Sequence, residues 1–137
     1  MYNPLMAASA ILAASSTNVS AQMSTFFDNF NKGHDTSIWI KSGGYANGSP
    51  FNVGWLSDHV QFTNDTTVSQ IMTLRLDNVH SSGMRYSSGE YRTKKKISYG
   101  TVSARIKAAR GNGLVSSLFV YTGPAYDDPW DEINIEF

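Results

Sequence analysis

Cysteine is absent from the 137-residue sequence, which excludes disulfides, thiolate metal sites and a cysteine nucleophile. Charge is scarce and balanced, because 11 basic and 11 acidic residues give a formal net charge of zero. We therefore expect neither nucleic acid nor an anionic membrane as a partner, since both attract basic surfaces. Aromatic residues are plentiful, at 12%, and suit either a β-sheet core or a surface on which sugar rings stack.

The first 21 residues contain no lysine or arginine, although they otherwise follow the pattern of a secretory signal peptide. An apolar stretch at residues 5–14, too short to span a bilayer, leads to small residues that suit cleavage before Gln22. We predict a signal peptide at residues 1–21, a secreted protein, and a folded domain within residues 22–137. The alternative is a tail with no targeting role.

Helix signals are missing from Ser24 onward, and short alternating segments between turn residues predict one all-β domain. Residues 43–54 are rich in Gly, Asn and Pro and predict a loop, while residues 110–113 predict a hairpin turn. Half-buried strands are expected around Val60 and Phe62, along 72–77 with Met72, Leu74 and Leu76 on one face, along 102–108, and along 114–121. The histidines His34, His59 and His80 lack metal-ligand spacing and are expected in loops or on the surface.

Residues 130–137 alternate in character and predict a strand with two different faces. One face carries Trp130, Glu132, Asn134 and Glu136, and the other carries Asp131, Ile133, Ile135 and Phe137. The second face is mostly apolar and suits a core. Like charges side by side on a strand are destabilising, so the acidic face indicates a function.

Cleavage of a glycosidic bond would use such a face, because that reaction needs two carboxyl groups flanking one sugar–sugar bond. Trp130 would offer a flat apolar surface to a pyranose ring. The Cα atoms of Glu132 and Glu136 are about 13 Å apart on an extended strand, so the carboxyl groups must lean together over the substrate. The alternative is the solvated face of an ordinary strand.

Several blocks of the sequence resemble glycoside hydrolase family 16, in the same order as in its bacterial lichenases, which are endo-β-1,3-1,4-glucanases. The last block, WDEINIEF, is similar to the family's active-site strand. The others are FFDNF near residue 26, GYANG at 44–48, FTND at 62–65, GEYR at 89–92 and VSSLFVYTGP at 115–124. Together they cover nearly everything from residue 25 to 137.

The resemblance implies a retaining double displacement in which Glu132 is the nucleophile and Glu136 the general acid/base. Asn134 departs from the family, which normally has Asp there, and an amide cannot titrate. We expect retained geometry with an altered rate. The implied contacts to a β-glucan substrate are Tyr45, Asn47, Phe51, Glu90, Arg92, Phe119, Tyr121 and Trp130. The residues alone favour a different interpretation, in which Tyr45 is a buried turn residue and Glu90 and Arg92 form a surface ion pair.

The resemblance also implies a concanavalin-like jelly-roll β-sandwich about twice as long as this chain. The sequence is therefore expected to be an incomplete, N-terminal part that lacks the C-terminal strands and is inactive by itself. No cofactor is expected for catalysis, and a structural Ca²⁺ is implied without assigned ligands. Two alternatives stay open: a β-glucan-binding fragment without catalysis, and an enzyme of the same family acting on β-1,3-glucan or xyloglucan.

Overall fold

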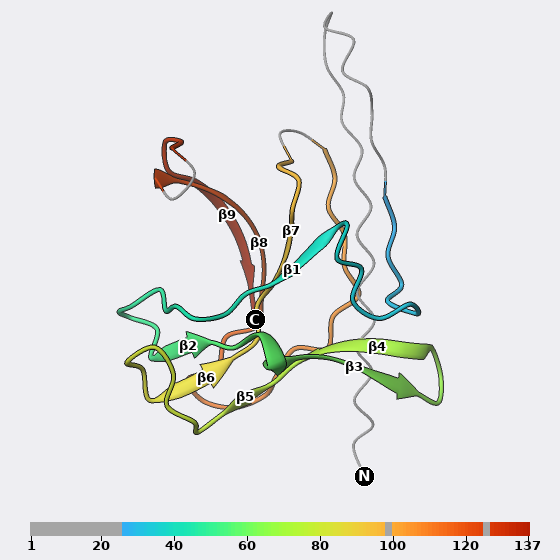
Figure 1. Ribbon diagram of the computed structural model, residues 1–137, viewed down its shortest axis with the longest axis horizontal. Coiled ribbons are helices and arrows are strands. Elements are labelled where there is room, and N and C mark those ends of the chain that lie inside the picture. The colour runs from blue at the N-terminus through green and yellow to red at the C-terminus, as the bar shows by residue number, and fades with distance from the viewer. Residues whose placement is uncertain (1–25, 98–99, 125–126) are drawn as a thin grey trace, which may run out of the picture. The chain divides into compact units, whose positions relative to one another are not determined.

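The computed structural model describes residues 26–97, 100–124 and 127–137, and this part of the chain is all-β as predicted (Figure 1). A short 3-10 turn, η1, spans Ser57–His59. Within those residues no helix has the length and apolar character needed to cross a membrane. The chain divides into two compact units, Met1–Arg105 and Ile106–Phe137. The predicted signal peptide lies outside the described residues.

Three small sheets form the first unit. β1 (Trp39–Lys41) pairs antiparallel with β7 (Tyr91–Thr93), and β3 (Val60–Asp65) pairs antiparallel with β4 (Ser69–Leu74). The third sheet has β6 (Tyr86–Ser88) between β2 (Val53–Trp55), which is parallel to it, and β5 (Leu76–Asp77), which is antiparallel. The predicted loop at 43–54 is thus confirmed except at its last two residues, which begin β2.

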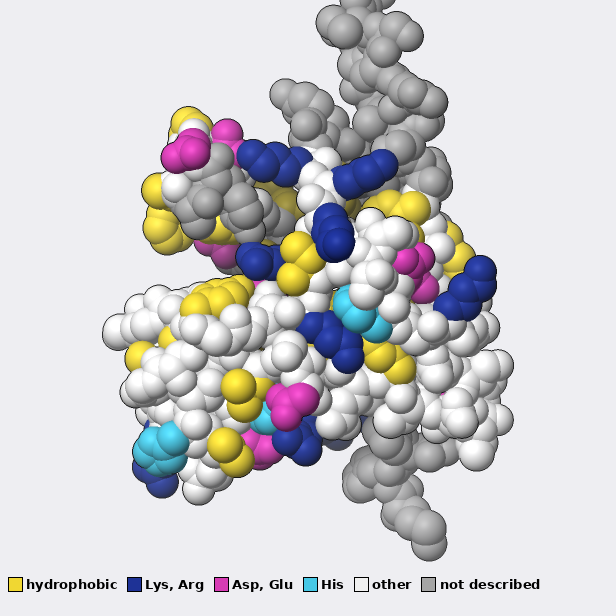
Figure 2. Space-filling view, viewed as in Figure 1, with side chains coloured by type: hydrophobic (Ala, Val, Ile, Leu, Met, Phe, Trp, Pro, Cys, Tyr) yellow, Lys and Arg dark blue, Asp and Glu magenta, His cyan; other side chains and the backbone are white. Residues whose placement is uncertain are grey.

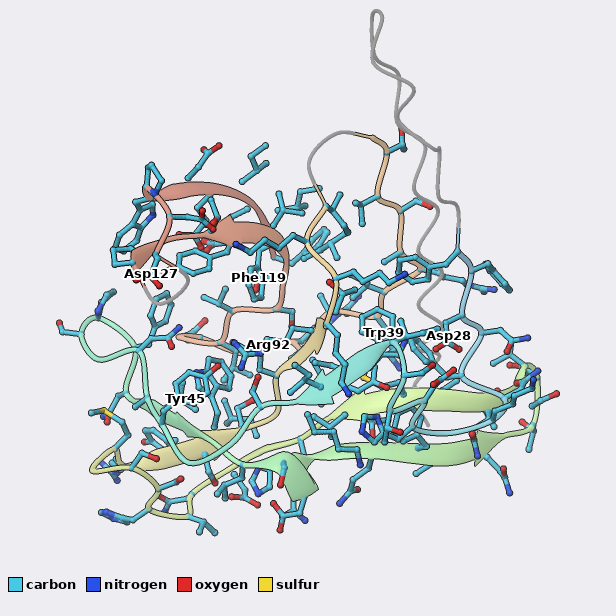
Figure 3. The ribbon with its side chains drawn as sticks, turned by 45° about the horizontal axis from the view of Figure 1, so that its top comes forward. Asp28, Trp39, Tyr45, Arg92, Phe119 and Asp127 are labelled. Carbon is cyan, nitrogen blue, oxygen red and sulfur yellow. The ribbon has the colours of Figure 1, made fainter. Side chains whose placement is uncertain are left out.

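Aromatic rings fill the interior of the first unit. Phe30 and Trp39 are almost completely buried, and Trp39 stacks on Tyr91 with ring centroids 4.7 Å apart. The indole N–H of Trp39 donates to Asp28 at 2.7 Å, which satisfies the polar edge of this buried ring (Figure 3). The aromatic residues near the N-terminus of the unit are therefore used for packing.

The prediction of one half-buried strand along 72–77 is wrong about both the continuity of the strand and its buried face. The chain changes partner at Arg75, because β4 pairs with β3 whereas β5 pairs with β6. Leu74 and Leu76 are 40% and 49% exposed, and the buried residue is Ile71 at 5%. Alternation along one segment cannot show where a strand leaves one sheet for another, so the face assignment failed at the crossing.

His59, which was expected in a loop or on the surface, lies in the short turn η1 but is only 1% exposed. Its Nδ1 lies 3.1 Å from the carbonyl oxygen of Arg75, and its Nε2 lies 2.9 Å from Nη2 of the same residue. A carbonyl can only accept and a guanidinium can only donate, so these contacts fit a ring that donates from Nδ1 and accepts at Nε2. Asp77 completes the group by pairing with Arg75 at 3.1 Å. His59 thus ties η1 to the point where the chain passes from β4 to β5.

The second unit is a hairpin of β8 (Ser117–Thr122) and β9 (Asp131–Glu136), which pair antiparallel along their whole length (Figure 1). The ladder continues one step further, with Ser116 and Phe137 exchanging both backbone hydrogen bonds. The predicted strand along 130–137 is therefore confirmed. So is the one along 114–121, although β8 begins and ends later than predicted.

Three other predictions for residues 102–137 are wrong. Residues 102–108 alternate as a strand would, yet none of them is in a strand, because no ladder partner accompanies them. A turn forms at 111–113, but it does not connect two paired strands, so it is not a hairpin turn. The apolar face of β9 is also not a core, since Ile133, Ile135 and Phe137 are 66%, 51% and 59% exposed. A two-stranded ribbon has no second layer to cover such a face.

Candidate functional site

The first candidate cluster is built around Glu90, which directly precedes β7. Glu90 is only 9% exposed, and the hydroxyl groups of Ser42 and Tyr45 both donate to its Oε1. The backbones of the two residues are also joined, because the N–H of Ser42 donates to the carbonyl oxygen of Glu90 at 3.0 Å. This is not the surface ion pair that the residues alone favoured. It is a buried carboxylate whose orientation is fixed by its donors.

Tyr45 links Glu90 to Arg92. The phenol hydroxyl is 2.6 Å from Oε1 of Glu90, and the guanidinium carbon of Arg92 lies 5.9 Å from the centre of the ring (Figure 3). Burial, and then the hydrogen bond to Glu90, raise the pKa of Tyr45 to about 12. The phenol therefore stays protonated and acts as a donor at any physiological pH. Three predicted substrate contacts thus form one cluster.

Asn47 and Phe51 lie further along the loop between β1 and β2. The side-chain oxygen of Asn47 accepts a hydrogen bond from the indole N–H of Trp55 at 3.1 Å. Phe51 is 43% exposed, and its backbone N–H donates to the carbonyl oxygen of Gly48 at 2.9 Å. Both residues are accessible to a ligand, and Asn47 is oriented by Trp55.

The second candidate cluster is the acidic row, the face of β9 that carries Glu132, Asn134 and Glu136. The register places these residues opposite Tyr121, Phe119 and Ser117 of β8, respectively. Directly paired residues of an antiparallel ladder project to the same side, so the acidic row and the two aromatic residues share one face. Every residue of β9 is exposed. The predicted row is therefore present and accessible.

Trp130 stands at one end of this row, just before β9. It is 71% exposed and meets the ring of Tyr121 edge-on, with centroids 5.9 Å apart and planes at 83°. Figure 2 shows hydrophobic and acidic side chains next to each other at this end of the hairpin. An exposed indole face beside carboxylates is the combination that a sugar ring requires, with an apolar surface for the ring and acceptors for its hydroxyls.

Four residues in these clusters were missed by the sequence reasoning. Ser42 donates to Glu90 across 48 residues of sequence, which no local spacing could reveal. Trp55 donates to Asn47 across the loop, eight residues away, but nothing in the loop composition indicated that pair. Gly89 lets the backbone of His59 pass closely, because a Cβ there would lie 2.7 Å from the carbonyl oxygen of His59. Gly123 instead leaves room for the side-chain ring of Tyr121. A glycine inside a motif was the only available signal for the last two.

The described residues contain no group of three or more His, Asp or Glu side chains that could hold a metal ion. A calcium site formed largely by backbone oxygens would not produce such a group. The structural Ca²⁺ therefore stays a prediction without assigned ligands. Catalysis without a cofactor also stays a prediction.

The model of the glycosyl hydrolases family 16 matches residues 47–137. A beta-glucanase of Acetivibrio thermocellus is 44% identical over 91% of this chain and 34% of its own length. A beta-glucanase of Bacillus subtilis is 39% identical over 92% and 50%, respectively, and an endo-1,3-1,4-beta-glycanase ExoK of Rhizobium meliloti is 39% identical over 82% and 39%. The crystal structure of a native glycosidic hydrolase is 44% identical, with a TM-score of 0.62 over 75% of this chain and 44% of that one.

The chain belongs to glycosyl hydrolases family 16, because the family model matches well over half of it. It spans between about a third and a half of the length of the curated relatives described above. The resemblance to this family is confirmed, and the fold is part of its jelly-roll β-sandwich, with sheets that are not closed in the described residues.

Proposed function

We propose that the chain carries the reacting carboxylates of an endo-acting β-1,3-1,4-glucanase that retains the anomeric configuration. The observation that carries this proposal is the register of β9, which places Glu132, Asn134 and Glu136 in one exposed row. Relatives named beta-glucanase and endo-1,3-1,4-beta-glycanase support the choice of a mixed-linkage glucan as substrate. We also propose that the protein is secreted, because a polysaccharide of this size is found outside the cell.

In this mechanism Glu132 attacks the anomeric carbon and forms a covalent glycosyl-enzyme, while Glu136 protonates the departing glycosidic oxygen. Glu136 then removes a proton from water, which attacks the same carbon and frees Glu132. Glu132 must start ionised and Glu136 protonated. Two ionised carboxylates that the substrate brings close together would repel each other, so an arrangement with one proton between them is favoured.

Asn134 lies between the two glutamates on the same face. Its amide can donate a hydrogen bond to the carboxylate of Glu132 and so hold the nucleophile in place, but it cannot exchange a proton. Phe119, opposite Asn134, supplies apolar surface to the same row. The cluster of Glu90, Tyr45 and Arg92 would bind sugar hydroxyls, because it presents fixed donors and an acceptor.

The test is release of reducing ends from barley β-glucan by the native protein that carries this chain, with β-1,3-glucan and xyloglucan as competing substrates. The proposal predicts cleavage of the mixed-linkage polymer and an initial product with the β configuration by NMR. Binding of the polymer without new reducing ends would instead identify a carbohydrate-binding protein. An α-configured initial product would contradict the retaining mechanism.

A further inference from the structure

Gly123 follows β8 directly and is buried, although Tyr121 and Pro124 on either side of it are exposed. A Cβ at this position would lie 2.3 Å from the hydroxyl oxygen of Tyr121 and 2.8 Å from the ring carbon that bears it. The φ of Gly123 lies outside the left-handed region, so backbone conformation does not explain the glycine. What the position requires is the absence of a side chain, because the tyrosine ring occupies the space.

The ring that uses this space is part of the aromatic end of the acidic row. Tyr121 pairs with Glu132 in the ladder and meets Trp130 edge-on. Edge-to-face pairs of aromatic rings favour one mutual orientation. The contact with Tyr121 therefore favours one orientation of Trp130, which lies two residues before Glu132.

We propose that Gly123 is a positioning residue for sugar binding. By leaving room for the Tyr121 ring, it maintains the edge-on contact that directs the exposed face of Trp130 toward a pyranose ring next to the nucleophile. The choice of a β-linked glucan as ligand rests on the proposed function, whereas the contact between the three residues does not.

Other features of this turn do not depend on the glycine. The hydroxyl of Thr122 donates to Asp128 at 2.9 Å, and backbone bonds join Asp127 to Pro124 and Asp128 to Gly123. An alanine at position 123 would keep all of these bonds, because none uses a side chain of that residue. Its nearest obstacle is the far end of a side chain that can rotate, so we expect the variant to fold with a displaced Tyr121.

The experiment compares Gly123→Ala with Pro124→Ala, a matched control in the same turn. In the native protein carrying this chain, G123A should change the near-UV circular dichroism of the Tyr–Trp pair and weaken mixed-linkage tetrasaccharide binding by about 2- to 10-fold. The control P124A should change neither. An unchanged near-UV spectrum in G123A would overturn the proposal.

A double-mutant cycle with Tyr121→Leu isolates the coupling. The variant Y121L should lose the same signal and affinity, and adding G123A to it should have no further effect, because the ring that alanine displaces is gone. If G123A alone proves unstable, the double variant should recover the stability of Y121L. Equal effects of G123A in both backgrounds would contradict the proposal.

The proposed function and the positioning role of Gly123 can be contradicted independently of each other. If the native protein does not bind mixed-linkage glucan, the proposed function is wrong, yet the near-UV spectra still decide whether Gly123 positions the aromatic pair. If the glucan binds and the G123A spectrum is unchanged, the proposed function stands and the role of Gly123 is wrong.

Discussion

Glu90 and the two glutamates of β9 are carboxylates of one chain in opposite environments. Glu90 is 9% exposed and receives hydrogen bonds from Ser42 and Tyr45. Glu132 and Glu136 stand on a strand whose six residues are all exposed. The first group is held in one geometry before any ligand arrives. The second pair keeps freedom to move toward a substrate.

This difference matches two kinds of task. A group that recognises hydroxyls gains from preorganisation, since little entropy is then lost on binding. A nucleophile and an acid/base on positions i and i+4 of a strand must approach each other from about 13 Å of Cα separation, so rigid fixation would prevent the required distance of about 5 Å. We infer that Glu90 binds and that the acidic row reacts, and substitutions should separate these roles.

The largest effect should come from Glu132→Gln, which keeps size and shape but removes the nucleophile. Cleavage of β-glucan should fall roughly 10³-fold or more, because no covalent intermediate can form. Stability should change by less than about 0.5 kcal/mol, since the side chain is exposed. Initial rates and urea unfolding measure both. A retained rate would show that Glu132 is not the nucleophile.

Glu90→Ala should show the reverse pattern. It leaves the buried hydroxyl of Ser42 without its acceptor, which costs about 1–3 kcal/mol of folding free energy. The KM for β-glucan should rise while kcat changes little, because the group binds but does not react. Ser42→Ala is the matched control, since it removes the donor and keeps the carboxylate. A fall in kcat with an unchanged KM would contradict the assignment.

A smaller effect is expected at Asn134, where the family resemblance implies Asp. Asn134→Asp should raise kcat roughly threefold to tenfold, below the 10²–10⁴-fold typical of a complete acid/base group. The pH–rate profile should also gain a dependence on the new carboxyl group. Asp131→Asn, on the opposite face of β9, is the control and should leave the profile unchanged. A slower N134D enzyme would count against the role given to this position.

The smallest effect concerns Tyr45, whose pKa is raised to about 12 by burial and by Glu90. The unfolded chain releases this proton near pH 10. Between pH 10 and 12 the unfolded chain therefore binds fewer protons, so stability present below pH 10 is lost as the pH rises through this window. Tyr45→Phe should therefore lose less folding stability between pH 10 and 12 than the unsubstituted chain does. Urea unfolding at several pH values in this range measures the difference. The substitution should also remove one late step from the absorbance titration at 295 nm. Loss of a step near pH 10 would contradict the structure.

The sequence was sufficient where the signal is local. Strict alternation at residues 130–137 predicted β9 and both of its faces, and a Gly- and Asn-rich stretch predicted the loop that carries Tyr45 and Asn47. Each of these features depends on neighbours along the chain. The motif resemblance then named the family, which the family model confirms.

The sequence failed where distant segments meet. Burial of His59 depends on Arg75 and Asp77, and the exposure of Leu74 and Leu76 depends on a change of partner strand at Arg75. The donor Ser42 lies 48 residues from Glu90. No periodicity within one segment encodes such contacts, which is why the family resemblance pointed to Tyr45, Glu90 and Arg92 but not to Ser42 beside them.

The most direct test of the division of roles is to trap the covalent intermediate. A mixed-linkage oligosaccharide with fluorine at C2 and an activated leaving group forms a glycosyl-enzyme that hydrolyses slowly, and peptide mass spectrometry locates the sugar. The proposed mechanism predicts one glycosyl group per protein, attached to Glu132. A label on Glu90 or Glu136, or active enzyme that hydrolyses β-glucan yet acquires no label, would contradict it.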